Sequence, residues 1–314
     1  MQLGYDRPLF ILPFDQRSSF EKGLFGLKPP LTEEQTATVI ASKQVVYEGF
    51  KLALSKGAPQ DTAGILVDEQ FGAAILRDAR ARGFITCAPT EKSGQEEFVF
   101  EYGDQWRDHI EIFAPTFAKV LVRYNAENDE AMNRRQAARL KELSDYCHRT
   151  GRRFLFELLV PMTPEQSDRL EGNQRLYDQH LRPSLMITAI KELQQVGVEP
   201  DVWKVEGLDR RADCEAVVAV ARRDGRDRVS CIVLGRGADE SGVLSWLGTA
   251  ATVRGFIGFA IGRTSFWDPL VGLRDRTVSR DAAVARIADR YAEWIQAFKT
   301  ARAGGPDGSH SGMA

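Results

Sequence analysis

Short apolar segments recur along this 314-residue chain, and each is followed by a longer stretch with helical spacing of apolar residues. A parallel strand that is buried on both faces is typically a continuous apolar run, and helices form the crossovers between such strands. The segments predicted to be strands are residues 9–14, 64–67, 84–87, 119–123, 154–160, 202–206, 230–234 and 256–261. Eight successive strand–helix units predict an α/β protein, a (β/α)8 TIM barrel that forms a single domain.

Capping residues mark the boundaries of the predicted helices. The segments 32–35 and 163–166 have the spacing of a capping box, Thr-x-x-Gln. Five glycines stand where a C-terminal helix cap belongs, between a helical stretch and the next strand: Gly57, Gly83, Gly151, Gly197 and Gly225. We expect the barrel to occupy residues 1–300 and the tail 301–314, which is rich in glycine and serine, to be disordered.

Two stretches interrupt the regular alternation. They are residues 19–31, after the first strand, and residues 90–116, where segment 97–102 could form a short hairpin. Both lie near the C-terminal ends of strands, which is the face where TIM barrels carry their active sites. We expect these stretches to shape a pocket or a lid, and the alternative is that they are decorative insertions.

Composition favours a small-molecule partner. The formal net charge is -2 and both signs are spread along the chain, which indicates neither nucleic-acid binding nor a membrane-binding surface. The apolar run at residues 8–14 is too short to cross a bilayer and is not followed by a signal-peptide cleavage pattern. The four cysteines show no CxxC spacing, which is typical of reduced thiols in a cytoplasmic protein. A homo-oligomer is compatible with this composition.

One lysine lies where a core strand should carry only apolar side chains. Lys204 is inside the segment Asp-Val-Trp-Lys-Val-Glu, and strand alternation places it on the same face as Val202 and Glu206. If that face lines the barrel interior, burial removes water from the amine and favours its neutral form. A neutral amine at this position could attack a substrate carbonyl and form a Schiff base.

Two more charged residues interrupt predicted core strands. Lys119 shares a strand face with Arg123, and Glu157 lies within the apolar segment Phe-Leu-Phe-Glu-Leu-Leu. A second interior cation would favour the neutral form of Lys204 by repulsion, and Glu157 could act as a general acid and base. The alternative is that both lysines are structural charges neutralised by Glu157 or Glu206, and spacing alone does not separate these readings.

Polar residues follow several of the predicted strands. Asp15, Gln16 and Arg17 end the first strand and Asp68 ends the second, so all four are candidate substrate contacts or, alternatively, loop caps. Arg123 and Glu206, at the ends of the fourth and sixth predicted strands, are further candidate substrate contacts.

Glycine–arginine pairs follow the last two strands, namely Gly235 with Arg236 and Gly262 with Arg263. Glycine lets backbone N–H groups approach an anion, and the loops after strands seven and eight often bind phosphate in TIM barrels. The alternative is tight turns with surface arginines.

Several cofactor motifs are missing from the sequence. There is no GxGxxG, no P-loop, and no HxH or HExxH pairing of the four histidines. We therefore expect a reaction that needs neither a metal nor an organic cofactor.

The segments DQR, FELLV, DVWKVEG and LGRG resemble the class I aldolases that act on tagatose bisphosphate and sulfofructose phosphate. Most closely, ILPFDQRSSF, GILVDEQFG, FLFELLVPMT, DVWKVEG and GFAIGRTSFWDP resemble the aldolase-like domain that is fused to the sugar kinase of myo-inositol catabolism. The resemblance implies roles for six residues: Lys204 as the Schiff-base lysine, Glu157 as the acid/base carboxylate, Lys119 and Asp15 as polar helpers, and Arg236 and Arg263 as phosphate contacts. The chain departs from the tagatose type at residues 68–71 and 207–209, which bears on the substrate more than on the reaction.

The implied activity is that of a carbon–carbon lyase. The expected substrate is a phosphorylated keto-sugar or keto-sugar acid, with 6-phospho-5-dehydro-2-deoxy-D-gluconate preferred, which would give dihydroxyacetone phosphate and malonate semialdehyde. One alternative is an aldolase for tagatose bisphosphate or sulfofructose phosphate. Another is a non-catalytic barrel that binds a phosphosugar and regulates a partner, because fold alone does not fix function.

Overall fold

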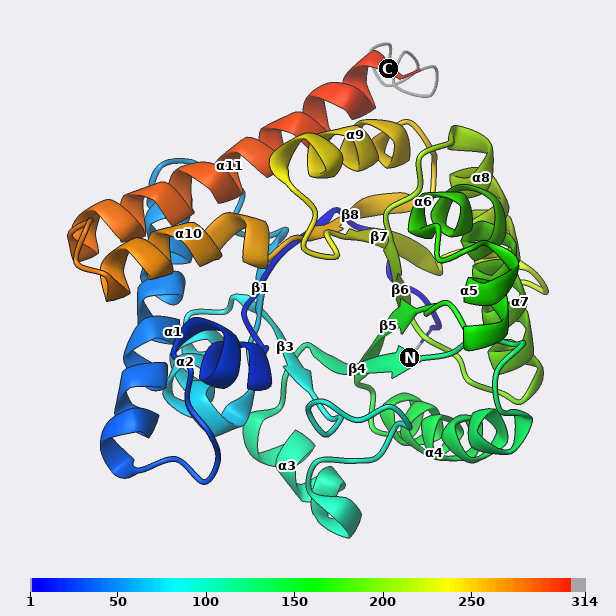
Figure 1. Ribbon diagram of the computed structural model, residues 1–314, viewed down its shortest axis with the longest axis horizontal. Helices are drawn as coiled ribbons and strands as arrows, with labels where there is room; N and C mark the ends of the chain where they lie inside the picture. The colour runs from blue at the N-terminus through cyan, green and yellow to red at the C-terminus, as the bar shows by residue number, and fades with distance from the viewer. Residues whose placement is uncertain (1, 306–314) are drawn as a thin grey trace.

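The computed structural model describes residues 2–305, and these form a closed barrel of eight parallel strands surrounded by helices (Figure 1). The strands are β1 (Leu9–Pro13), β2 (Ala63–Leu66), β3 (Ile85–Pro89), β4 (Phe117–Arg123), β5 (Arg153–Leu159), β6 (Val202–Glu206), β7 (Ser230–Leu234) and β8 (Phe256–Ala260). They pair in chain order, and β1 closes the ring by pairing with β8 through the register Phe10 to Phe259. The predicted single-domain (β/α)8 barrel is confirmed.

Helices cover the outside of the ring. The α-helices are α1 (Glu33–Ser55), α2 (Glu69–Ala81), α3 (Trp106–Phe113), α4 (Glu130–Arg149), α5 (Pro164–Arg169), α6 (Gln174–Leu176), α7 (Arg182–Gln195), α8 (Arg211–Arg222), α9 (Glu240–Ala251), α10 (Arg263–Arg274) and α11 (Arg280–Gly304). Short π-helical segments η1 (Ser19–Leu24) and η3 (Tyr177–Leu181) and the 3-10 turn η2 (Gly103–Gln105) lie between them. The long helix α11 packs against α1, α9 and α10 across one side of the barrel (Figure 1).

The predicted helix boundaries are largely confirmed. Thr32 and Thr163 each form a complete capping box, and the five predicted capping glycines have positive φ between 70° and 103°. The predicted C-terminal boundary of the barrel, residue 300, needs correction, because α11 continues to Gly304. Arg302 binds the carbonyl oxygen of Phe256 in β8, which holds the last turn against the barrel. The rest of the predicted tail, residues 306–314, lies outside the described residues.

Apolar side chains fill the barrel interior below its C-terminal mouth. We call this set the interior plug, and it consists of Tyr5, Leu9, Ile11, Leu66, Ile85, Cys87, Phe117, Leu155, Val202, Ile232 and Ala260. A second and larger apolar cluster fills the layer between the strands and the helices. On β4, β5 and β6 the plug residues Phe117, Leu155 and Val202 are each followed, at the next inward-facing position, by a charged residue. The strand period of two therefore stacks a charged layer directly on an apolar one.

The cysteines are structural. All four are buried and free of disulfides, and burial raises the pKa of Cys214 and Cys231 to about 12. Such thiols are unreactive at neutral pH. Within residues 2–305, no helix is long and apolar enough to cross a lipid bilayer.

Candidate active site

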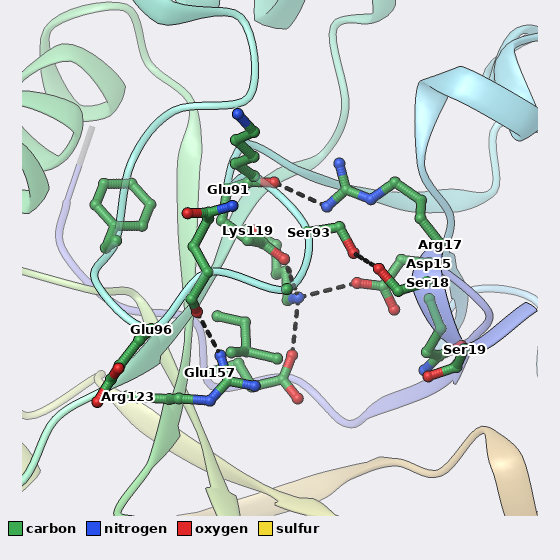
Figure 2. Close-up of a pocket in the computed structure, with 16 residues that line it drawn as sticks. Asp15, Arg17, Ser18, Ser19, Glu91, Ser93, Glu96, Lys119, Arg123 and Glu157 are labelled. Carbon is green, nitrogen blue, oxygen red and sulfur yellow. Dashed lines mark hydrogen bonds and ion pairs between the residues drawn. The ribbon is translucent and has the colours of Figure 1, made fainter. Parts of the chain in front are cut away.

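Five charged side chains meet inside the barrel on top of the interior plug. We call this set the charged cluster: Lys119 from β4, Glu157 from β5, Lys204 from β6, Asp15 just after β1, and Glu91 just after β3. The Lys119 amine lies 2.9 Å from Asp15 Oδ2, 2.7 Å from Glu91 Oε1 and 2.9 Å from Glu157 Oε2. Figure 2 shows this amine between the Asp15 and Glu157 carboxylates. The same Glu157 oxygen is 2.9 Å from the amine of Lys204, so one carboxylate joins both predicted lysines.

The cluster fixes the protonation of its members in opposite directions. Burial alone would lower the pKa of Lys119, but the carboxylates of Asp15, Glu157 and Glu91 raise it well above its ordinary value. Burial alone would raise the pKa of Glu157 and of Asp15, but the two lysine ammonium groups hold both pKa values below their ordinary range. For Glu91, burial prevails and raises the pKa. Lys119 is therefore a permanent cation, and Glu91 is the carboxyl of this cluster that most readily binds a proton.

Lys204 differs from Lys119 in its surroundings. Its side chain is 2% exposed, and its ion pair within the described residues is with Glu157. The sequence predicted apolar neighbours around the Lys204 amine. This expectation needs correction, because the Glu157 carboxylate takes the place of the water that the amine loses on burial. The predicted neutralisation of the lysines holds for Glu157, which pairs with both of them, and not for Glu206, which pairs with Arg236.

Two adjoining cavities open above the charged cluster. The first cavity, about 200 Å³, lies between the end of β1 and segment 91–98, and Lys119 is in its floor (Figure 2). The second cavity, about 260 Å³, lies between the ends of β6, β7 and β8, and Lys204 faces it. Residues shared by both cavities form the boundary between them: Gln16, Ser19, Leu121, Arg123 and Glu157.

The second cavity carries the predicted glycine–arginine pairs. Gly235, Arg236, Gly262 and Arg263 all line it. Gly262 caps the N-terminus of α10, where a Cβ would lie 2.1 Å from the Pro13 carbonyl oxygen, so only glycine fits. Arg263 is exposed on the first turn of α10. Backbone N–H groups at a helix N-terminus together with guanidinium groups make this rim suited to an anion such as phosphate.

Arg236 is positioned by two carboxylates. Its Nε lies 3.0 Å from Glu206 Oε1 and its Nη1 lies 2.8 Å from Asp178 Oδ1. The second oxygen of Glu206 accepts the N–H of Val160 at 2.9 Å, and burial raises the pKa of this carboxyl. Glu206 therefore supports Arg236 from below, although the sequence predicted a substrate contact.

Asp68 also has a structural place. It caps α2 by accepting the N–H of Phe71 at 2.9 Å, and it forms a buried ion pair with Lys43. Among residues 2–305, neither Asp68 nor Glu206 lines the two cavities. The predicted substrate contacts at these two positions therefore need correction.

Lys43 is a third buried lysine that sequence reasoning missed. Its amine donates to the carbonyl oxygens of Phe14 at 2.8 Å and Gln16 at 3.1 Å, which flank Asp15. It lies in α1 on the same helix face as Val39, four residues earlier, and this spacing was a signal for burial. Lys43 thus fixes the backbone that carries Asp15.

Segment 90–101 borders the first cavity, as the sequence predicted for the longer stretch 90–116. Glu91 pairs with Phe100 in an antiparallel bridge, close to the expected hairpin. Arg17 holds this segment through Glu101 Oε2 at 2.7 Å and the Glu91 carbonyl oxygen at 2.8 Å. Arg123 holds it through the Gln95 carbonyl oxygen at 2.8 Å. In the described part of the chain, no group of three or more His, Cys, Asp or Glu residues is arranged to hold a metal ion.

Comparison with known proteins supports the same fold. The fructose-bisphosphate aldolase of Plasmodium falciparum, crystallised with TRAP and a small-molecule inhibitor, matches with a TM-score of 0.62 and 13% identity over 96% of this chain and 93% of that one. A fructose-bisphosphate aldolase from Slackia heliotrinireducens matches with a TM-score of 0.54 and 13% identity over 90% and 86% of the two chains. A Schiff-base-forming fructose-1,6-bisphosphate aldolase matches with a TM-score of 0.53 and 12% identity over 91% and 93%. At these identities the similarity concerns the fold.

Sequence comparison gives the family. No curated protein matches this sequence. A family model described as an uncharacterized protein conserved in bacteria, DUF2090, matches residues 5–302, which is nearly the whole barrel. This chain, an aldolase-like barrel with two lysines joined by one carboxylate at its mouth, therefore belongs to the DUF2090 family.

Proposed function

We propose that this protein is a Schiff-base-forming, class I aldolase that cleaves a phosphorylated keto-sugar or keto-sugar acid. One observation carries the proposal: the Lys204 amine lies 2.9 Å from Glu157 Oε2 and faces a cavity whose rim bears Arg236 and Arg263. A nucleophile, a proton acceptor and an anion-binding rim are thus within one site, at the barrel face where catalysis is expected. The fold similarity to aldolases supports the proposal.

The arrangement suggests a sequence of steps. Lys204 gives a proton to Glu157 and attacks the substrate ketone to form a carbinolamine. Glu157 returns this proton to the carbinolamine hydroxyl, which leaves as water, so an iminium forms and Glu157 is again a carboxylate. Glu157 then accepts the proton of the hydroxyl on the carbon that becomes the aldehyde, and the electrons of the broken C–C bond move into the iminium to form an enamine. Protonation of the enamine and addition of water release dihydroxyacetone phosphate and restore the amine. Lys119 keeps Glu157 ionised through its fixed positive charge.

The preferred substrate is 6-phospho-5-dehydro-2-deoxy-D-gluconate, whose cleavage would give dihydroxyacetone phosphate and malonate semialdehyde. The resemblance of five sequence segments to the aldolase-like domain of myo-inositol catabolism supports this choice. In this assignment the phosphate lies at the N-terminus of α10, beside Arg236 and Arg263. Turnover assays with this substrate and with tagatose 1,6-bisphosphate distinguish the preferred activity from its alternative.

Borohydride trapping tests the reaction type. Incubation with dihydroxyacetone phosphate and sodium borohydride should add a stable mass to the peptide that contains Lys204, and Lys204→Met should abolish the addition. Lys191→Met is a matched control. Lys191 is exposed on α7 and lines neither cavity, so its replacement should leave trapping intact. An adduct at Lys119 would reassign the nucleophile. Binding of the phosphosugar without any adduct would favour a non-catalytic, regulatory barrel.

A further inference from the structure

Three polar atoms in the first cavity are buried and lack a hydrogen-bond partner among the described residues. They are Glu91 Oε2, Gln16 Oε1 and Arg17 Nε, and all three residues line this cavity. The residues Glu91 and Arg17 are only 7% and 6% exposed. A buried polar group without a partner costs about 1–3 kcal/mol, so native structures rarely leave several together without a purpose. Their grouping in one cavity points to a ligand that completes their hydrogen bonds.

The unpartnered atoms are held rigidly. The other oxygen of Glu91 is 2.7 Å from the Lys119 amine, and the two terminal nitrogens of Arg17 bind Glu101 and the Glu91 carbonyl oxygen. The side chains of Glu91 and Arg17 are therefore fixed by their remaining polar atoms, so a ligand that binds the unpartnered atoms costs little further side-chain freedom. Preorganisation of this kind is typical of a binding site.

The two cavities differ in charge. The described residues that line the second cavity carry an excess of positive charge, with Arg123, Lys204, Arg236 and Arg263 against Glu157. Those that line the first cavity are balanced, with Arg17, Lys92, Lys119 and Arg123 against Asp15, Glu91, Glu96 and Glu157. Carboxylates outside the linings pair with Arg17 in the first cavity, through Glu101, and with Arg236 in the second, through Asp178 and Glu206, and the second cavity still keeps the more positive charge. A phosphate dianion is thus favoured in the second cavity and opposed in the first.

We infer that the first cavity binds the half of the substrate that is released as the aldehyde, and that Glu91 excludes a second phosphate from it. This inference rests on the proposed aldolase reaction. Gln16 Oε1 and Glu91 Oε2 accept hydrogen bonds from substrate hydroxyl groups, and Arg17 Nε donates to a hydroxyl oxygen or, in the preferred substrate, to the terminal carboxylate. The balanced lining accommodates this single negative charge but opposes the larger charge of a phosphate dianion. A phosphate in the same place would put its charged oxygens beside the carboxylates of Glu91 and Asp15. Glu91 is therefore a specificity-determining residue for ketose monophosphates over ketose bisphosphates.

Saturation of borohydride trapping measures this preference without requiring cleavage. Fructose 1-phosphate and fructose 1,6-bisphosphate differ only in the second phosphate, and each carries a ketone that Lys204 can attack. The monophosphate should half-saturate trapping of the wild-type protein at a concentration at least about tenfold lower than the bisphosphate, a difference of about 1.4 kcal/mol. In Glu91→Gln, which keeps the shape and the contact to Lys119, the ratio should fall to about threefold or less.

Asp104→Asn is the matched control. Asp104 is an exposed carboxylate in η2 that lines neither cavity, so removal of its charge should leave the ratio within about twofold of wild type. Equal or tighter binding of the bisphosphate by the wild-type protein, or an unchanged ratio in Glu91→Gln, would overturn the inference while trapping itself upholds the aldolase reaction. Absence of an adduct even with dihydroxyacetone phosphate would overturn the proposed function and this inference together.

Discussion

The interior plug and the charged cluster lie on the same strands, yet they have opposite chemistry. On β4, β5 and β6, Phe117, Leu155 and Val202 belong to the plug, and the next inward-facing residue on each strand belongs to the cluster. Burial of the plug stabilises the barrel by about 25 cal/mol for each Å² of apolar surface removed from water. Burial of the cluster costs desolvation free energy, which ion pairing offsets only in part. The plug therefore stabilises the fold, whereas the layer above it holds buried charges that reduce its stability.

The largest expected effect is a loss of activity when the charged cluster is altered. Lys204→Met should reduce kcat/KM for the proposed cleavage by at least about 10⁴-fold, or about 5.5 kcal/mol of transition-state stabilisation, because the nucleophile is lost. Its stability should change by less than about 1 kcal/mol, because Glu157 keeps its contact with Lys119. Lys204→Arg, which retains a cation but no amine nucleophile, should be equally inactive in the same assay. Activity within a hundredfold of wild type in either variant would contradict the assigned role.

Removal of the other lysine should act on stability. Lys119→Met leaves three buried carboxylates without their shared cation and should lower the free energy of unfolding by about 4 kcal/mol, measured by urea denaturation at pH 7. Addition of Glu91→Gln to this variant should recover part of the loss, since it removes one uncompensated charge. If the free energy of unfolding falls no more in Lys119→Met than in Lys204→Met, the larger structural role of Lys119 is contradicted.

Truncation of the plug should lower stability with little effect on chemistry. Leu155→Ala should lower the free energy of unfolding by about 3 kcal/mol through lost burial and a residual cavity. Its kcat/KM per folded molecule should stay within about threefold of wild type. A loss of activity much larger than this, at unchanged stability, would show that the plug shapes the cluster directly.

The smallest effect concerns acid stability. The folded pKa of Asp15 lies below its unfolded value, so its ionisation stabilises the fold fully above the ordinary carboxyl range near about 4, and this stabilisation is lost as the pH falls through the folded pKa. Asp15→Asn should therefore be less stable than wild type by about 1 kcal/mol at pH 7, and the gap should close toward pH 2. Thermal unfolding between pH 2 and pH 7 measures both curves. A constant gap across this range would show that the carboxylate charge does not stabilise the barrel.

The strands and the buried lysine of β6 were readable from the sequence because both depend on local pattern. Apolar runs of strand length located all eight strands within a few residues, and Lys204 was identifiable as a charge within such a run. The glycine–arginine pairs were placed at one cavity for a similar reason, since the ends of β7 and β8 adjoin in any closed barrel.

The residues that were missed or assigned to the wrong role depend on pairing between distant segments. Asp68 ends a strand, as a site residue would, but its partner Lys43 comes from a helix and removes it from the mouth. Glu91 follows β3 in an irregular segment, and only its bridge to Phe100 and its contact with Lys119 bring it into the barrel. No local spacing encodes such contacts.

The pairing of β1 with β8 has a consequence for how this chain is made. Until residues 256–260 of β8 have been synthesised, β1 can pair only with β2, and its other edge is open. The hydrogen bond from the Tyr291 hydroxyl to the Phe10 carbonyl oxygen, at 2.6 Å, spans 281 positions and belongs to the same late step. The ring can therefore close only after nearly the whole chain has been synthesised, and such pairing of distant segments is slow because loop-closure entropy must be lost first.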